Sequence, residues 1–322
     1  MIQDQVFRRR TLLLSAAAAP AAALRGPASA RPDTSTETTM TDVHYRTLQV
    51  GPAEVFYREA GPADAPVILL LHGFPTASHM FRDLIPALAD RYRVIAPDLP
   101  GFGLTKVPGR GEFEYSFDNL ARVVGQLVDA IGLTRYALYV FDYGAPVGLR
   151  LAMAHPERVT AIVSQNGNAY AEGLSSDWEP WQAYWREPTQ ANRERCRGAL
   201  TDEAIRAQYE HGAPAGRVAP DGQMLDRFYM GRPGADEIQL DLILSYRTNV
   251  ALYPAFQAYF RAHRPRLLAV WGRNDPYFLP AGAEAYRRDL PDAEVHLLET
   301  GHFALETHHR EIATHIRRFI PA

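Results

Sequence analysis

Short runs of β-branched and apolar residues recur along the chain and predict a series of buried strands. Each run ends in turn residues, as expected for strands that are buried on both faces of a sheet. The predicted strands are Val67–Leu71, Arg93–Ala96, Tyr136–Phe141, Val159–Val163, Leu267–Trp271 and Glu294–Leu298. Between several of them, apolar residues recur at helical spacing, as over Asn119–Ile131, which has one continuous apolar face. This alternation predicts an α/β fold with a mainly parallel sheet covered by helices on both faces.

The alternation is interrupted between Asn168 and His263. This stretch has long helical or irregular patterns and is rich in aromatic residues. They are Trp178, Trp181, Tyr184, Trp185, Tyr229, Tyr246 and Tyr253. We interpret residues 168–263 as an inserted helical cap on an α/β core that is formed by residues 44–167 and 264–322.

Residues 1–30 have the layout of an export signal peptide. The arginines Arg8–Arg10 precede an uncharged run, Thr11–Leu24, and the small residues Ala28–Ala30 follow as a cleavage site. The adjacent arginines resemble a twin-arginine signal, which directs export of folded proteins, and the apolar run is too short to span a bilayer. We therefore expect a signal peptide, then a polar linker over residues 31–43, and a periplasmic or extracellular mature protein that is not inserted in a membrane.

The composition limits the classes of function that the chain can have. Of its 322 residues, 47% are hydrophobic and 22% are charged, which is typical of a protein with a large buried core. The formal net charge of −3 provides no excess of basic residues for a phosphate backbone, so we expect no nucleic-acid partner. The single cysteine, Cys196, excludes an intramolecular disulfide and a cysteine-based zinc or iron–sulfur site.

The segment that carries the chemistry follows the predicted strand Tyr136–Phe141. Asp142 stands between this strand and a helical pattern over Val147–Ala154, and Gly144 lacks the Cβ that would collide in a sharp strand-to-helix turn. Such a turn, a nucleophile elbow, holds one side chain at the carboxyl edge of the sheet beside the N–H groups of a helix N-terminus. We expect Asp142 to be that side chain. The alternative is an aspartate that only caps a helix.

Further motifs end other predicted strands at the same edge of the sheet. A His-Gly-Phe-Pro motif follows an early strand, and the N–H of Phe74 is expected to pair with that of Tyr143 as an oxyanion hole. Later strands are followed by a carboxylate, Asp275, and by a histidine, His302. A nucleophile, an acid and a base are therefore expected in chain order at Asp142, Asp275 and His302.

Together these motifs resemble the α/β-hydrolase fold family over roughly residues 44–320. An aspartate at the elbow, in place of serine or cysteine, is similar to the epoxide hydrolase and haloalkane dehalogenase branch of that family. The resemblance implies an α/β-hydrolase fold with a cap, and it implies that Asp142, Asp275 and His302 act as nucleophile, acid and base. Some members place the acid after the strand that precedes the cap, but Ser164–Asn168 contains no carboxylate.

A carboxylate nucleophile constrains the reaction. It attacks esters and amides poorly, but it displaces a leaving group from an sp³ carbon and forms an alkyl ester with the enzyme. His302, oriented by Asp275, is then expected to take a proton from water, and this water attacks the carbonyl of the Asp142 ester. The expected partners are water and a small apolar substrate, either an epoxide or an alkyl halide, with no metal or organic cofactor.

The leaving group decides between these two substrates. An epoxide oxygen needs an O–H donor, and Ser245–Asn249 resembles the epoxide hydrolase cap segment that carries a ring-opening tyrosine. We therefore favour an epoxide hydrolase that forms a vicinal diol, with Tyr246 as the donor. Trp181 stands where the first lid tyrosine of those enzymes is expected, and Tyr184 is a second candidate for substrate binding.

Two alternatives remain. A haloalkane dehalogenase is favoured by His72–Ser78 and by Val140, which resemble that class, and its halide would bind at Tyr143 or at a cap tryptophan such as Trp181. Tyr143 departs from the tryptophan that usually follows the nucleophile in both classes. The other alternative is a small-molecule binding protein that has this fold without catalysis.

Overall fold

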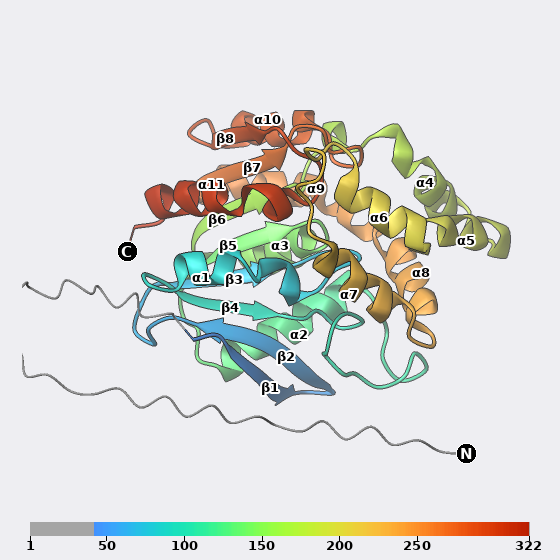
Figure 1. Cartoon of the computed structure of the whole chain (residues 1–322), viewed down its shortest axis with the longest axis horizontal. Coiled ribbons are helices and arrows are strands. Elements are labelled where there is room, and N and C mark those ends of the chain that lie inside the picture. Colours follow the sequence, from blue (N-terminus) through green and yellow to red (C-terminus); the bar gives the residue numbers. More distant parts are fainter. Residues whose placement is uncertain (1–41, 322) are drawn as a thin grey trace, which may run out of the picture. The chain divides into compact units, whose positions relative to one another are not determined.

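The structure, a computed structural model, describes residues 42–321. These residues form an eight-stranded sheet with helices on both faces (Figure 1). The strands are β1 (His44–Val50), β2 (Ala53–Ala60), β3 (Val67–Leu71), β4 (Arg93–Pro97), β5 (Tyr136–Phe141), β6 (Val159–Gln165), β7 (Leu267–Gly272) and β8 (Glu294–Leu298). Their order is β1-β2-β4-β3-β5-β6-β7-β8. Neighbours from β4 to β8 are parallel, whereas β1 and β2 form an antiparallel extension at one edge.

The predicted mainly parallel sheet is confirmed, and every predicted strand is present. The prediction omits β1 and β2. Five of the seven residues of β1 are exposed, so this strand has no buried apolar run. In β2 the apolar residues are interrupted by Glu54, Arg58 and Glu59. An exposed edge strand, and a strand whose apolar residues are interrupted by charged ones, therefore escape a prediction that rests on apolar runs.

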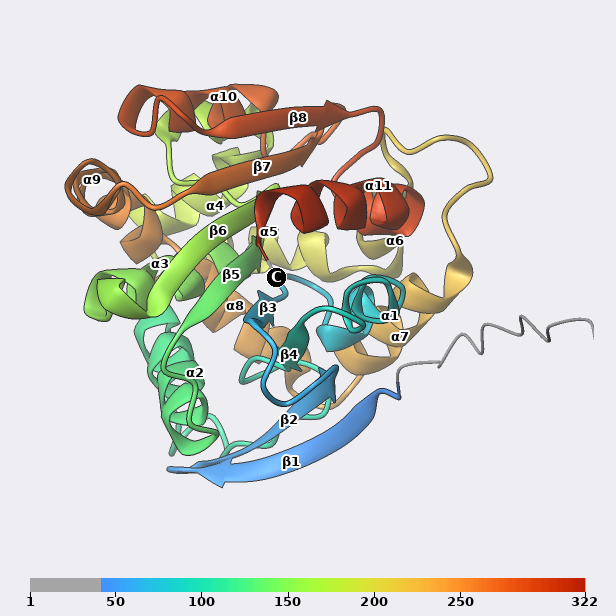
Figure 2. The ribbon, with the colours of Figure 1, turned by 90° about the vertical axis from the view of Figure 1, so that its left-hand side faces the viewer.

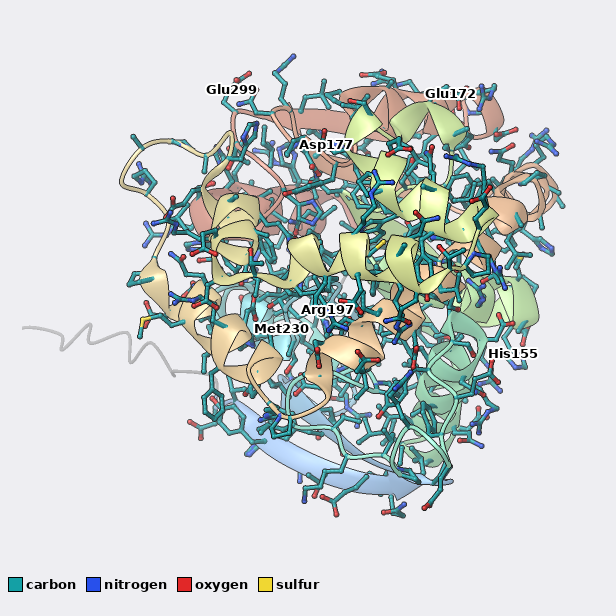
Figure 3. All side chains as sticks on the ribbon, turned by 90° about the vertical axis from the view of Figure 1, so that its right-hand side faces the viewer. His155, Glu172, Asp177, Arg197, Met230 and Glu299 are labelled. Atoms are coloured by element: carbon teal, nitrogen blue, oxygen red, sulfur yellow. The ribbon has the colours of Figure 1, made fainter. Side chains whose placement is uncertain are left out.

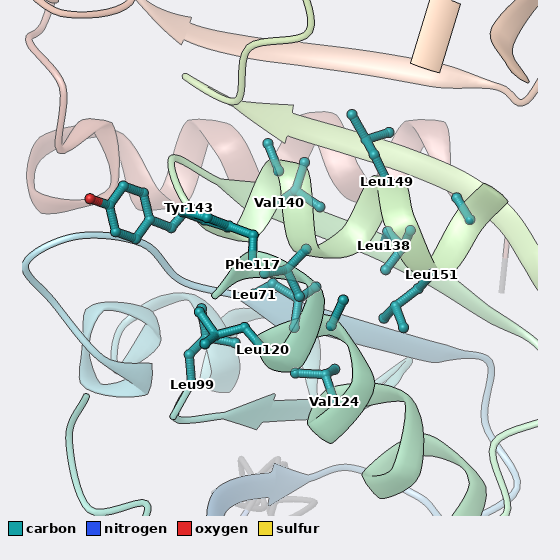
Figure 4. Close-up of a cluster of buried hydrophobic side chains, with 14 of the residues drawn as sticks. Leu71, Leu99, Phe117, Leu120, Val124, Leu138, Val140, Tyr143, Leu149 and Leu151 are labelled. Carbon is teal, nitrogen blue, oxygen red and sulfur yellow. The ribbon is translucent and has the colours of Figure 1, made fainter. Parts of the chain in front are cut away.

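The two faces of the sheet bury separate apolar clusters, because successive residues of a strand point to opposite faces. Outside the inserted segment, the helices are η1 (Ser78–Phe81), α1 (Leu84–Leu88), α2 (Phe117–Ala130), α3 (Gly144–Ala154), η2 (Pro156–Arg158), α10 (Pro280–Asp289) and α11 (Ala304–Phe319). Leu69 and Leu71 pack in one cluster with α2 and α3, part of which Figure 4 shows. Ile68 and Leu70 pack in the other with α1 and α11. Figure 2 shows these helices on the two sides of the sheet.

Helix α2 begins two residues before the predicted helix, because Ser116 caps it. The hydroxyl of Ser116 accepts a hydrogen bond from the N–H of Asn119 at 3.4 Å, and the helix ends before Ile131. Its apolar face is buried against the sheet, as the periodicity predicts. The spacing of the apolar residues therefore identified the packing face of α2 correctly, while the start of the helix depends on its N-cap residue, Ser116.

A long helical segment connects β6 to β7. It comprises η3 (Ala171–Gly173), η4 (Ser176–Trp178), α4 (Glu179–Arg186), α5 (Gln190–Cys196), η5 (Arg197–Leu200), α6 (Asp202–Glu210), α7 (Pro220–Met230), α8 (Ala235–Ser245) and α9 (Arg247–His263). Helices α4 to α8 lie at the carboxyl ends of the parallel strands (Figure 1). Helix α9 buries Phe256 and Phe260 in the same cluster as α2 and α3, so the end of the inserted segment packs on the core.

The expected signal peptide, residues 1–30, and nearly all of the linker over residues 31–43 lie outside the described residues. Within residues 42–321, no helix combines the length and the apolar composition needed to cross a bilayer.

Candidate active site

Asp142 occupies a strained turn between β5 and α3. Its φ of 47° lies in the left-handed region, which side chains other than glycine seldom adopt. Two glycines make room for the turn. A Cβ on Gly144 would lie 2.2 Å from the carbonyl oxygen of Leu71, and a Cβ on Gly73 would lie 2.2 Å from Oδ1 of Asp142. The elbow therefore brings the carboxylate against the His-Gly-Phe-Pro loop, which a larger residue at either glycine would prevent.

The carboxylate of Asp142 is buried and held by backbone N–H groups. The N–H of Phe74 donates a hydrogen bond to its Oδ1 at 2.5 Å, and the N–H of Tyr143 also hydrogen-bonds to it. Burial raises the pKa of Asp142 to about 6, against the opposing effects of His302 and of these two N–H groups. The structure thus brings both predicted oxyanion-hole donors to one carboxylate that is ionised at neutral pH.

His302 and Asp275 form a buried pair. Nδ1 of His302 lies 2.7 Å from Oδ2 of Asp275, and both side chains are almost fully inaccessible. Oδ1 of Asp275 accepts hydrogen bonds from the N–H groups of Tyr277 and Phe278 at 2.8 and 3.2 Å. Burial lowers the pKa of His302, but Asp275 and the charge on Asp142 raise it more, so the net shift is upward. The histidine is thereby oriented by a carboxylate with a full set of donors.

Asn166 is a further member of this network that the sequence analysis missed. It follows the buried part of β6 with a φ of 45°, and its Nδ2 donates to Oδ2 of Asp275 at 2.6 Å. Its Oδ1 accepts from the N–H of Gly272 at 3.0 Å. The Asn-Gly pair at the end of a buried strand was the available sequence signal, because asparagine tolerates the left-handed region better than most residues. In this chain an amide therefore holds Asp275 from the strand end where Ser164–Asn168 lacks a carboxylate.

A cavity of about 100 Å³ opens beside the carboxylate. It is lined by Phe74, Asp142, Asp177, Trp178, Trp181, Ala199, Ala204, Gln208, Tyr277, Phe278 and His302. The core contributes the nucleophile and the histidine, and the inserted segment contributes the residues from Asp177 to Gln208. Phe74 and Trp181 lie where the sequence analysis expected them. Trp178, Gln208 and Tyr277 are lining residues that it did not assign to the site.

Tyr246 lies beside this cavity without lining it. Its ring is buried between the rings of Trp178 and Trp185, with centroids at 4.8 and 5.8 Å, and it contacts Tyr143 at 5.6 Å. Its hydroxyl hydrogen-bonds to that of Tyr253. Burial raises the pKa of Tyr246 well above its usual value, and Tyr253 and the charge on Asp142 add to the shift. The expected donor therefore lies close enough to Asp142 for the charge of the carboxylate to raise the pKa of Tyr246. Its hydroxyl forms a hydrogen bond with the hydroxyl of Tyr253.

Tyr143 and Tyr184 also lie outside the cavity. The ring of Tyr143 packs against Phe117 at 4.9 Å, and its buried hydroxyl has no hydrogen-bond partner within residues 42–321. Tyr184 packs with Cys196 in a small cluster inside the cap, and its hydroxyl accepts a hydrogen bond from Arg193 at 3.0 Å. Tyr184 was expected to bind substrate, but it does not line the cavity; it packs toward α5 and α8 in a cluster against which the lining residue Trp181 also packs.

No group of three or more His, Cys, Asp or Glu side chains within the described range is arranged to hold a metal ion.

A family model described as the alpha/beta hydrolase fold matches residues 66–309. The chain belongs to the α/β-hydrolase fold family. It is 48% identical over 269 residues to the uncharacterized hydrolase YNR064C of Saccharomyces cerevisiae, covering 82% of this chain and 92% of that protein.

Members of this family with named activities are also similar. A haloalkane dehalogenase of Mycobacterium marinum is 32% identical over 223 residues, covering 68% of this chain and 72% of that protein. The structure of a Pseudomonas aeruginosa protein proposed to be an epoxide hydrolase has a TM-score of 0.70 at 20% identity, covering 86% of this chain and 95% of that one. The structural likeness shows the fold, and the chain is an α/β-fold hydrolase.

Proposed function

We propose that this α/β-fold hydrolase attacks an electrophilic sp³ carbon through Asp142 and that its substrate is a small epoxide, which it converts to a vicinal diol. The observation that carries the proposal is the aspartate at the elbow. It is buried at a strained φ, it receives N–H donors from Phe74 and Tyr143, and it shares a cavity with His302. A carboxylate in this position suits displacement at carbon better than acyl transfer.

The proposed reaction has two steps. A carboxylate oxygen of Asp142 bonds to an epoxide carbon, the ring C–O bond breaks, and the ring oxygen takes a proton from Tyr246. His302 then takes a proton from water, and the resulting hydroxide attacks the ester carbonyl carbon of Asp142. The N–H groups of Phe74 and Tyr143 hold the oxyanion until the diol leaves and the carboxylate is restored. The proton on His302 returns to Tyr246, which completes the cycle.

The buried tyrosines support an epoxide as the substrate. A departing alkoxide is a strong base and needs a proton, which an apolar wall does not supply. The raised pKa of Tyr246 keeps its proton in place at neutral pH, and the neighbouring Tyr253 hydroxyl accepts a hydrogen bond from it. Tyr253 is in turn held by Nδ2 of Asn168, which donates to its hydroxyl at 3.3 Å. The hydrogen bond to Tyr253 therefore holds the proton on Tyr246 until the departing alkoxide, which is a stronger base, takes it.

One observation favours an alkyl halide as a second candidate. The chain has four tryptophans, and three of their indole N–H groups donate to main-chain carbonyl groups of Tyr277, Ile243 and Phe278. The indole N–H group of the fourth tryptophan, Trp181, has no acceptor among residues 42–321, and Trp181 lines the cavity. A weak donor in an apolar pocket is the kind of group that a departing halide requires.

Parallel assays of 1,2-epoxybutane and 1-bromopropane test the two candidates. We expect diol formation to be lost in Asp142→Asn and to fall about a hundredfold in Tyr246→Phe, because general-acid assistance contributes at least that much. Tyr184→Phe is the matched control, since Tyr184 is a buried cap tyrosine that does not line the cavity, and it should retain full activity. Bromide release that depends on Asp142 and on Trp181, with no diol formed, would replace the epoxide proposal by the dehalogenase one.

Trapping the covalent intermediate tests the mechanism itself. In His302→Gln, ester formation should proceed while hydrolysis stalls, so mass spectrometry should find a substrate adduct on Asp142. An adduct on another residue would exclude the proposed mechanism for either substrate.

We also propose that the protein is exported, on the basis of the N-terminal sequence alone. Expression of the full chain with Arg9 and Arg10 both changed to lysine should retain the precursor inside the cell. Equal export of both forms would contradict a twin-arginine signal.

A further inference from the structure

Gln208 is a buried polar residue in the wall of the cavity whose partner is missing. It lies on α6, is only 6% exposed, and lines the cavity together with the nucleophile. Its side-chain amide takes part in no hydrogen bond within the range 42–321. The amide nitrogens of other buried glutamines are bonded to protein groups: Nε2 of Gln165 donates to the carbonyl of His302 at 3.3 Å, and Nε2 of Gln239 donates to that of Gly101 at 3.4 Å, although Oε1 of Gln239 has no partner among the described residues. Gln208 thus differs from them in facing a space instead of a protein group.

An amide in such a position is expected to have a ligand. The amide is not among the fully buried atoms that lack a partner, so it reaches the space of the cavity. A ligand that displaces water from this space must supply hydrogen bonds of its own to the amide. The neighbouring walls of the cavity provide few hydrogen-bonding groups for Gln208, because they present mainly the apolar surface of aromatic side chains, those of Phe74, Trp178, Trp181 and Phe278. A group on the substrate would satisfy both the donor and the acceptor of the amide.

The charge around the cavity limits the nature of that group. No Lys or Arg is among the lining residues, whereas Asp177 is exposed and lines the cavity from the surface of the cap (Figure 3). The nucleophile adds a second negative charge inside. An anionic substituent would therefore be repelled, and a neutral hydroxyl, ether or carbonyl oxygen remains.

We propose that Gln208 is a substrate-recognition residue and that the enzyme prefers a small electrophile bearing a neutral hydrogen-bonding group next to its reacting carbons over a plain hydrocarbon of equal size. This rests on the proposed function, in that the electrophilic carbon is attacked by Asp142. The inference narrows the substrate class from simple alkyl epoxides to hydroxylated or otherwise oxygenated ones.

Isosteric substrate pairs test the proposal, because each pair differs only by a hydroxyl in place of a methyl group. The pairs are glycidol against 1,2-epoxybutane, 3,4-epoxy-1-butanol against 1,2-epoxypentane, and 2-bromoethanol against 1-bromopropane. For each, the hydroxyl-to-methyl ratio of kcat/KM is measured in the wild type, in Gln208→Leu and in Gln208→Met. We expect the ratio to fall about tenfold in both variants for at least one pair, because each variant loses one hydrogen bond between the amide and the substrate hydroxyl.

Gln182→Leu is the matched control, since Gln182 is also a cap glutamine but does not line the cavity, and its ratios should equal those of the wild type. A merely structural role for Gln208 would lower kcat/KM alike for both members of a pair and leave the ratio unchanged. That result, in variants that keep the wild-type melting temperature, would overturn the proposal.

A binding measurement separates this inference from the proposed function. The cavity contains Trp178 and Trp181, so tryptophan fluorescence reports occupancy without turnover. If the wild type turns over none of the pairs, the proposed function fails, and the affinities for glycerol and 1,2-butanediol then decide the inference. A preference for glycerol that disappears in Gln208→Leu supports recognition by the amide, and equal affinities in both proteins refute it.

Discussion

Removal of the negative charge from Asp142 should stabilise the fold while it abolishes the reaction. The carboxylate is 6% exposed and sits at a strained φ of 47° beside apolar rings. An asparagine side chain would keep the shape of this carboxylate and an oxygen for the N–H of Phe74, and asparagine tolerates the backbone conformation. We therefore predict that Asp142→Asn unfolds at higher urea concentration than the wild type at pH 8.

The magnitude follows from the pKa of the carboxyl group. Burial raises the pKa of Asp142 from 3.8 to about 6. At about 1.4 kcal/mol per pKa unit, the ionised carboxylate destabilises the native state by about 3 kcal/mol at pH 8. Because the folded-state pKa is above the unfolded-state value, the native protein binds more protons between the two, and stability falls as the pH rises through this window. At pH 4.5 the same calculation leaves a difference of only about 1 kcal/mol.

The assay is urea unfolding of the wild type and of Asp142→Asn at pH 8 and pH 4.5, followed by circular dichroism. Asp64→Asn is the control, because Asp64 is exposed in the loop before β3 and its substitution should leave the stability difference near zero at both pH values. The reasoning would be refuted by an Asp142→Asn variant that is no more stable than the wild type at pH 8. A gain of equal size at both pH values would also refute it, because a charge effect must depend on pH.

Three further predictions concern the pH profile and the packing around the elbow. The value of kcat/KM should fall about tenfold between pH 8 and pH 5, because Asp142 with a pKa of about 6 is then mostly protonated and cannot attack, and a flat profile from initial rates would contradict this. Gly144→Ala should destabilise the protein by at least about 3 kcal/mol in urea unfolding, because its Cβ would lie 2.2 Å from the carbonyl oxygen of Leu71. Arg150→Met should lower the unfolding free energy by about 2 kcal/mol, because the buried Arg150 donates to Oδ1 of Asn249 at 2.7 Å and thereby ties α3 to the turn that begins α9. Unchanged urea midpoints would contradict either of these packing predictions.

Much of the core could be predicted from local sequence patterns. A buried parallel strand is a short apolar run, so the runs from β3 to β8 were recognisable without any knowledge of their neighbours. The chain order of the motifs after Phe141, Gly272 and Thr300 placed a carboxylate, a second carboxylate and a histidine at one edge. Parallel strands with right-handed connections bring their carboxyl ends together, and the structure does bring Asp142, Asp275 and His302 into one buried site.

The cap could not be predicted in the same way. Its tryptophans and tyrosines recur at helical spacing, but the spacing does not reveal which face of each helix meets the cavity. The structure turns Trp181 toward the nucleophile and Tyr184 into a cluster with Cys196, although both lie on α4. Tyr246 ends among aromatic rings beside the cavity, and its hydroxyl pairs with that of Tyr253.

Local sequence patterns are sufficient to predict the fold class, the order of the central strands along the chain and the residue types that stand at the ends of those strands. These features depend on the period of apolar residues and on glycines at tight turns, which are local properties. Three features depend instead on how the folded chain packs. Asn166 supports Asp275, Gln208 faces the cavity without a protein partner, and Tyr184 does not line the cavity. Such contacts depend on how separate helices and strands pack, and packing is set by shape and by hydrogen-bond satisfaction over the whole molecule.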